Sequence, residues 1–423
     1  MRAIRNYLVF LGRSLGLAFS GDWRYYLWIG FLFFWCLLGL NAYAKQYVHG
    51  LAITGMSDQV SWGVYIANFT FLVGVAAAAV MLVIPVYIYK NEELHDLVIF
   101  GELLAVAAII MCLAFVGVDL GRPDRFWHAL PGLGEFNFPG SVMSWDVIVL
   151  NGYLLLNIHI CGYMLYSRYC GRKPAPWFYI PFVFISILWA ISIHTVTAFL
   201  YVGLGGRPFW NSAIVGPRFI ASAFTAGPAI IILALQVIRR VTDYKITNRA
   251  LLTLRSIVQV SMLINVFLLI NEVFKEFYTG NLHVASAKYL FLGLHGHNGL
   301  VPWIWTAIAC NLVAMVILVL PISRGLRWLD LACVLAIVGI WIEKGMGLIV
   351  PGFIPTPLGE IIEYTPTLNE TLVSFGIWAM GLLLYTIFLR MSVPILQGRL
   401  SQANEKRSSI TESEKEIRGV VMH

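Results

Sequence analysis

Charged side chains are scarce in this chain, at 12% of its 423 residues, whereas hydrophobic residues make up 59%. A soluble globular domain carries about a quarter charged residues. The composition therefore excludes an ordinary soluble domain and indicates a chain that lies mostly in lipid. The net charge of +7 does not indicate nucleic-acid binding, because the basic residues follow the membrane topology described below.

The sequence also lacks clustered cysteines and paired histidines. Its six cysteines form no CxxC pair and have no regular spacing, so we expect no iron–sulfur cluster in this chain. A bis-histidine haem needs two histidines at one depth, but His159 lies toward the inner half of its span and His194 toward the outer half of the next. His295 and His297 have no third ligand in view, which favours a loop over a metal site. We expect neither haem nor metal.

Ten long apolar stretches are the main feature of the chain. Each covers roughly 20 residues, enough to cross a hydrocarbon core of ~30 Å, so we predict an all-α integral membrane protein. The predicted spans are 24–44, 61–89, 96–118, 142–166, 177–201, 217–238, 250–273, 300–320, 327–348 and 370–390. Residues 1–394 then form a single polytopic membrane domain, and residues 395–423 form a polar tail.

Basic residues are distributed unequally between the two sides of these spans. With the N-terminus inside, 21 of the 29 Lys and Arg residues lie in inner segments and 8 lie in outer ones. The positive-inside rule then predicts a protein of the cytoplasmic (inner) membrane with both termini and the tail in the cytoplasm. The long loops 119–141, 202–216, 274–299 and 349–369 all lie outside. Such loops either carry function and docking surfaces or only cap helix ends.

A weak internal repeat links the two halves of the chain. The second span begins SWGVYIANFTFLVGVAAAAV and the sixth PRFIASAFTAGPAIIIL, and both run from a polar, aromatic mouth into small residues. Small residues let helices pack closely in lipid. We therefore predict two four-helix bundles, spans 2–5 within residues 60–201 and spans 6–9 within residues 216–348, with spans 1 and 10 peripheral.

Ionisable residues within spans are costly in lipid and are therefore functional candidates. Those at the outer ends of the first bundle are Asp119, Asp146 and His194. An acid or imidazole there can accept a proton from a substrate. The alternatives are an Asp119–Arg122 ion pair and a core histidine that is bonded to a neighbouring helix. In the second bundle, we interpret Glu272, Glu343 and Lys344 as stabilising charges, and Arg218 lies at a helix mouth. Glu343 and Lys344 point about 100° apart on a helix and therefore need other partners.

Glu102 lies near the inner end of the span that carries Asp119. The two are 17 residues apart, or about 25 Å at the rise of an α-helix. Glu102 is therefore too deep to share a site with Asp119. It suits a proton path from the inner side, with His159 as a second member; the alternative is a buried acid that only packs.

Several motifs together resemble the NrfD/PsrC family of membrane subunits. They are WGVYIANFTFLVG at 62–74, GELLAVAAII with Glu102, VDLGRPDRFW at 118–127, SWDV at 144–147, and the stretch from 192 to 229. The last is similar to the ten-span branch, which includes the membrane subunit of hydrogenase-2-type enzymes and DsrP of the DsrMKJOP complex, and length favours DsrP. The resemblance covers most of residues 60–230 and is weaker beyond.

The resemblance implies a quinone or menaquinone site near the outer face, without a resident redox cofactor. It implies an extracytoplasmic, ferredoxin-like iron–sulfur subunit on the outer loops, and further subunits such as cytochromes. The resulting complex would serve sulfur- or sulfite-linked anaerobic respiration and could translocate protons. Asp119 and His194 become the predicted catalytic pair. The predicted quinone-binding residues are Trp62, Tyr65, Asn68, Asp119, Arg122, Trp145, Asp146 and His194. Trp62 and Trp145 have an alternative role as interfacial anchors.

Two other classes of function remain open at this point. A transporter or channel would show broken helices or an inverted repeat, whereas the repeat here reads as parallel. A purely structural anchor would leave Asp119 and His194 without a role. Whether the chain handles a quinone or only anchors its partners, we do not expect it to be catalytic alone.

Overall fold

The structure, a computed structural model, describes residues 2–130, 132–280 and 284–402. Within these residues, ten helical segments are long and apolar enough to cross a membrane, and no strand occurs. The all-α prediction and the predicted number of spans are therefore confirmed. The spans are Trp23–Ile53, Val64–Ile88, Val98–Asp119, Val142–Tyr169, Pro176–Val202, Val215–Val241, Asn248–Tyr278, Val301–Val319, Leu326–Phe353 and Leu368–Leu396. Most of the predicted tail, 403–423, lies outside the described residues.

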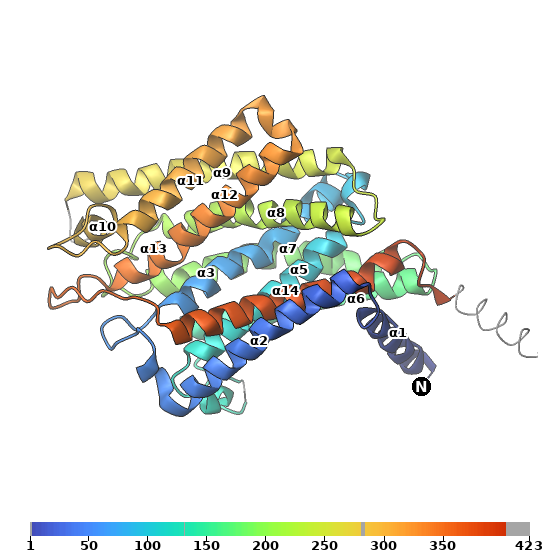
Figure 1. Ribbon diagram of the computed structural model, residues 1–423, viewed down its shortest axis with the longest axis horizontal. Helices are drawn as coiled ribbons and strands as arrows, with labels where there is room; N and C mark the ends of the chain where they lie inside the picture. The colour runs from blue at the N-terminus through green and yellow to red at the C-terminus, as the bar shows by residue number, and fades with distance from the viewer. Residues whose placement is uncertain (1, 131, 281–283, 403–423) are drawn as a thin grey trace, which may run out of the picture.

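The long helices run side by side, and their connections alternate between two ends (Figure 1). They are α2 (Trp23–His49), α3 (Val64–Ala76), α5 (Val98–Asp119), α6 (Val142–Tyr169), α7 (Pro176–Val202), α8 (Val215–Val241), α9 (Asn248–Thr279), α11 (Val301–Val319), α12 (Leu326–Lys344) and α14 (Leu368–Leu396). We call the end with the connections 120–141, 203–214, 280–300 and 354–367 the loop end. The opposite end, with α1 (Arg2–Ala18) and the last residues of α14, is the terminal end.

The helices of each predicted bundle contact one another in a closed order. In the first group, α3 packs on α5, α5 on α6, α6 on α7, and α7 on α3. In the second group, α8 packs on α9, α9 on α11, α11 on α12, and α12 on α8. The two groups meet where α8 contacts α3 and α7. This interface is built from small residues: a Cβ on Gly227 would lie 2.5 Å from the Cβ of Ala78.

The first and last spans pair with each other. α2 and α14 are in extensive contact, and α14 also packs on α5 and α3. A Cβ on Gly39 of α2 would lie 2.6 Å from the Cα of Gly376 in α14, so the two backbones approach closely. Because lipid removes most of the hydrophobic drive for helix association, such close van der Waals packing is what holds membrane helices together. Of the two helices, α2 is the more peripheral, since α14 reaches the first group.

The second span is interrupted, although its sequence predicts one continuous helix. α3 ends at Ala76 and is followed by a 3-10 turn (Ala77–Ala79), α4 (Val80–Val83) and a π-helical turn (Ile84–Ile88). Pro85 lies within the last turn and has no N–H to donate to a preceding carbonyl. The alanine turn is fully buried against α8 and α5, so the interruption is a packed one.

An amphipathic helix precedes the first span, and the sequence analysis did not identify it. α1 buries Phe10 against the rings of Tyr166 and Tyr169 at the terminal end of α6. The turn after α1 is fixed by Arg390 of α14, which donates to the Ser20 carbonyl and covers the Tyr25 ring at 4.7 Å. The N-terminal segment is thus attached to the terminal end of the helices.

The charge asymmetry predicts that the loop end faces away from the cytoplasm. We expect a cysteine at exposed His128 or at Leu358, which is 88% exposed, to react with a membrane-impermeant maleimide in intact cells. A cysteine at exposed Lys173, at the terminal end, is the matched control and should react only after the membrane is opened. The reverse pattern of labelling would contradict the orientation.

Candidate functional site

Tyr65, near the start of α3, is tied to α2 and α5 at the loop end. Its hydroxyl donates to Gln46 Oε1 at 2.6 Å, and Gln46 Nε2 donates to the Val118 carbonyl at 2.6 Å. Tyr65 and Gln46 are both buried. The relay orients the last turn of α5, which carries Asp119. Gln46 was not among the predicted site residues, since a single amide near the end of an apolar span gives no sequence signal.

Asp119 is the last residue of α5, and its Oδ1 atom is buried without a hydrogen-bond partner among the described residues. The predicted alternative, an ion pair with Arg122, is wrong. Arg122 instead holds Asp124 through two hydrogen bonds of 3.0 Å in the exposed loop. The Asp119 carboxylate interacts electrostatically with Glu370 and with Tyr65. A buried acceptor without a partner is costly, so it marks a place where a ligand or water would bind.

Glu370, at the start of α14, is a second acid at this end that the sequence analysis missed. It is fully buried, and it accepts from Tyr364 Oη at 2.6 Å and from the Gly55 N–H at 2.7 Å. With Thr367 it forms a capping box. The Thr-x-x-Glu spacing at a helix start was the available signal. Burial, and then the Glu370 charge, raise the pKa of Tyr364 far above its usual value, so this phenol stays a donor.

Asp146 and Tyr201 take part in neighbouring polar contacts among α6, α7 and α3. Asp146 is buried and accepts from Thr197 Oγ1 at 2.8 Å. The Tyr201 hydroxyl is hydrogen-bonded to Thr70 Oγ1 and interacts electrostatically with both Asp146 and Asp119. Tyr201 therefore links the two predicted acids, although its own sequence context did not distinguish it from an interfacial anchor.

Trp62 packs on Tyr201 as part of an aromatic cluster. Its ring stacks on Trp210 at 5.6 Å and meets Tyr201 and Phe353 edge-on, each at 5.8 Å. Trp210 is fully buried and donates to the Leu348 carbonyl. The cluster joins the first group to the connection after α12. This supports a ring-packing role for Trp62 over that of an interfacial anchor.

His194 is buried in α7 and lines a narrow cavity. Its Nδ1 is 3.0 Å from the Ala190 carbonyl, while Nε2 is buried without a partner among the described residues. The same cavity is lined by Thr70, Ser222 and Lys344. Because Thr70 also bonds Tyr201, a strip of polar side chains runs from Tyr201, which feels the Asp119 charge, through Thr70 to the cavity of His194.

The remaining predicted quinone-binding residues are not part of this strip. Asn68 is clamped between helices: its Oδ1 accepts from Trp341 and Trp378, both at 3.0 Å, and its Nδ2 donates to Val64. Trp145 is 40% exposed and donates to the Pro139 carbonyl, as expected of an interfacial anchor. Arg122 lies in the exposed loop with Asp124. The hydrogen-bonding groups of Asn68, Trp145 and Arg122 thus already have partners in neighbouring residues.

Glu102 and His159 lie in different environments toward the terminal end. Both carboxylate oxygens of Glu102 are buried without a partner among the described residues, and its neighbours include Tyr87 and Tyr153. His159 packs on Phe178 and Phe182 of α7, so the structure does not bring it to Glu102. Between Glu102 and Asp119, α5 carries no titratable side chain except Cys112.

A pocket of about 460 Å³ lies at the terminal end, just before α5. Its lining includes Glu93, His95, Asp96 and Tyr244. The hydrogen bond from His95, and the charge of Arg168, hold the pKa of Asp96 below its usual value. Leu97, another lining residue, precedes Glu102 by five positions, or about 7 Å of helix. The pocket thus lies at the terminal end of the helix that carries Glu102.

The second group contains a buried charge cluster. Arg218 of α8 bridges Glu272 of α9 and Glu343 of α12, the latter at 2.7 Å. Asn311 donates to Glu343 Oε2 at 2.8 Å. The expectation that Glu343 and Lys344 point apart is only partly met, since Lys344 Nζ lies 3.6 Å from Glu343 Oε1. Each nevertheless reaches its own set of partners.

Among the described residues, no group of three or more His, Cys, Asp or Glu side chains is arranged to hold a metal ion. His297, of the motif considered above, pairs with Glu363 at 3.2 Å. Glu363 also accepts from the Gly299 N–H at 3.0 Å. These contacts join the connection after α10 (Val284–Phe291) to that before α14.

Residues 52–354 match the family described as Polysulphide reductase, NrfD. The sequence is 23% identical over 385 residues to the Hdr-like menaquinol oxidoreductase integral membrane subunit of Archaeoglobus fulgidus, a match that spans 87% of this protein and 93% of that one. It is 25% identical over 403 residues to a putative dimethyl sulfoxide reductase membrane subunit of Halobacterium salinarum, spanning 86% and 90%.

A shorter match is to a polysulfide reductase chain of Wolinella succinogenes, 29% identical over 184 residues, which are 40% of this protein and 56% of that one. None of these three relatives is named as a DsrP subunit, the subfamily that the sequence favoured. The family match spans well over half of the chain and includes both helix groups. With its ten apolar helices, the chain is thus a multi-pass membrane protein that belongs to the polysulphide reductase NrfD family.

Proposed function

We propose that this chain binds a quinol at the loop end of its first helix group and passes the electrons to an iron–sulfur subunit docked on the loops. One observation carries the proposal. Asp119 Oδ1 and His194 Nε2, from the two residues predicted to be catalytic, are both buried polar atoms without a partner among the described residues. A quinol hydroxyl needs such an acceptor, because its oxidation releases two protons with two electrons.

The polar strip between these two atoms supports the same site. The Asp119 charge acts electrostatically on Tyr65 and Tyr201, and Thr70 connects Tyr201 to the cavity of His194. The aromatic cluster of Trp62 packs on Tyr201 in this region, and a quinone ring would bind beside it. By analogy with the menaquinol named for the Archaeoglobus relative, menaquinol is the proposed substrate, in anaerobic respiration that reduces or oxidises sulfur compounds.

The loop end supplies a surface for the proposed partner. The connection between α5 and α6 exposes an apolar patch of Phe126, Trp127, Leu130, Leu133 and Phe138, each at least 37% exposed. Exposed apolar patches rimmed by polar residues mark protein interfaces. A subunit docked there would bring its cluster over Asp119. Further subunits, cytochromes among them, belong to the same proposal.

The interrupted second span does not favour a transporter. Transporters use broken helices whose unwound carbonyls and helix ends face an ion or solute. Here the break at Ala77–Ala79 is fully buried among the packed helices α5 and α8. A purely structural anchor would leave two buried acceptors unsatisfied at one end, at a cost of about 1–3 kcal/mol each.

Photolabelling locates the proposed site directly. With the intact complex and an azidoquinone, we expect labelled peptides from α3, α5 and α7, and competition by excess quinol. The labelled residues are read by mass spectrometry. Labelling restricted to α9, α11 and α12 would place the quinone in the second group and contradict the proposal.

Removing the proposed proton acceptor should slow quinol oxidation. A positioned acid or base contributes typically 10²–10⁴-fold, so Asp119→Asn should lower the turnover number by about that range, less where water substitutes. Glu360→Gln changes an exposed acid outside the proposed docking patch and should behave as the unaltered complex. The measurement is steady-state quinol oxidation by the purified complex; equal rates for both variants would exclude Asp119 as the acceptor.

Glu102 is proposed to take up protons from the terminal end, through the pocket near Asp96. Because Glu102 lies about 25 Å from Asp119 by helix rise, Glu102→Gln should leave quinone affinity and turnover near those of the unaltered complex. Charge movement across proteoliposome membranes, followed with a voltage-sensitive dye, should fall. Glu102→Asp keeps the carboxyl group and should retain part of it. Loss of quinone binding in Glu102→Gln would refute this assignment.

A further inference from the structure

Two neighbouring residues at the end of α12 face two different cavities. Lys344 lines the narrow cavity that also contains His194, at the interface of the two helix groups. Glu343 lines a second cavity, inside the second group and beneath α10. Both residues are buried, at 4% and 3% exposure. Nζ of Lys344 and Oε1 of Glu343 are 3.6 Å apart, so the ion pair connects the two cavities.

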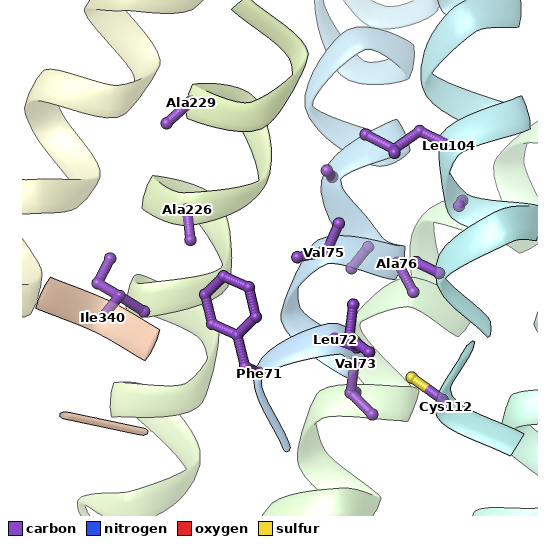
Figure 2. Close-up of a cluster of buried hydrophobic side chains, with 14 of the residues drawn as sticks. Phe71, Leu72, Val73, Val75, Ala76, Leu104, Cys112, Ala226, Ala229 and Ile340 are labelled. Atoms are coloured by element: carbon purple, nitrogen blue, oxygen red, sulfur yellow. The ribbon is translucent and has the colours of Figure 1, made fainter. Parts of the chain in front are cut away.

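The first cavity has polar walls and an apolar floor. Thr70 of α3, His194 of α7, Ser222 of α8 and Lys344 of α12 supply its polar atoms, and the Lys344 ammonium lies 5.7 Å from the Phe219 ring centre. Phe71 also lines the cavity. Figure 2 shows Phe71 reaching from α3 toward α8, beside Ala226 and Ile340. Phe71, Ala226 and Ile340 thus form apolar lining of the cavity.

The second cavity continues the polar path toward the loop end. Arg218, Glu272, Glu276 and Glu343 line it. Glu272 and Glu276 are one helical turn apart on α9, and Glu276 is 3.1 Å from Lys275, whose side chain is 39% exposed. The buried acids therefore extend from Glu343 to a residue at the surface of the second group.

We propose that Lys344 and Glu343 carry a proton sideways from the first helix group to the second. This inference rests on the proposed function, because the proton comes from the quinol by way of His194. Lys344 releases one proton to the Glu343 carboxylate and regains one across the cavity from protonated His194. The net change is that His194 loses one proton and Glu343 gains one. No electron moves, and no other bond is made or broken.

The residues that face Lys344 account for the direction of proton transfer. Glu343 is the carboxylate beside it, Arg218 of α8 is a nearby cation, and His194 of α7 is the titratable group on the opposite wall. Arg218 binds both Glu343 and Glu272, which holds the next acceptor in place. Protons leaving by Glu272 and Glu276 would emerge from the second group, away from the surface where the iron–sulfur partner docks.

The decisive experiment replaces Lys344 by arginine in the full complex in proteoliposomes. Arginine keeps the positive charge beside Glu343 but does not release a proton, so it separates proton transfer from a structural ion pair. We expect Lys344→Arg and Lys344→Met both to slow proton release at the loop end by at least about tenfold, within the range for a lost acid–base group. Proton release is followed with a pH-sensitive dye after rapid mixing with quinol.

Ser222→Val provides a second test that leaves the charges in place. Ser222 Oγ bonds the Phe219 carbonyl of its own helix, and valine replaces its hydroxyl by methyl groups in the cavity, so proton release should slow again. Lys288→Arg, at an exposed position on α10, is the matched control and should have no effect. Normal release in Lys344→Arg, or in Ser222→Val when the Lys344 variants do not assemble, would overturn the proposal.

The photolabelling experiment distinguishes a failure of the sideways proton path from a failure of the proposed function. If the unaltered complex is labelled in the first group and Lys344→Arg releases protons normally, only the sideways path is wrong. If the unaltered complex takes up no quinone in the first group, the proposed function itself is wrong, and the source of the proton with it.

Discussion

The close contact between α3 and α8 is the constraint on which the rest of the structure depends. Gly74 and Ala78 of α3 and the following turn face Ala223 and Gly227 of α8, and a Cβ on Gly227 would already be 2.5 Å from Ala78. In lipid such helices associate by packing and not by hydrophobic burial. Only side chains this small let the two helix groups approach until His194 and Lys344 line one cavity. A larger residue here would separate the groups and the polar residues between them.

The buried polar residues divide into two kinds. Asn68 and Gln46 are bonded by residues from other helices, and Glu370 is bonded by the connections before α3 and α14, so they fix how the helices pack. Asp119, His194 and Glu102 each retain buried atoms without a partner among the described residues. Because an unsatisfied polar group is costly in a low-dielectric interior, such groups persist where substrate, water or protons are handled. This division points to the chemistry more directly than the list of charged residues does.

The arrangement separates three tasks along the molecule. The loop end of the first group holds the proposed quinol site, beneath a connection whose apolar side chains are exposed. Glu102 and the pocket near Asp96 serve the terminal end, with the apolar stretch of α5 between them and Asp119. The second group holds the charge cluster that would lead protons outward. Electrons and protons from one substrate would therefore leave by different surfaces.

The sequence by itself determined the ten spans, because the length of an apolar run and the cost of a charge in lipid are local properties. It also placed Asp119 at the end of one span and His194 within another, since position along a helix follows from the sequence. It did not determine which residues meet. Arg122 binds Asp124 and not Asp119, Glu370 joins the site from the last span, and Lys344 reaches the cavity of His194. The break after Ala76 was equally invisible. These features depend on the rotation of each helix about its axis and on contacts between residues hundreds of positions apart, which only the tertiary packing of small against small side chains decides.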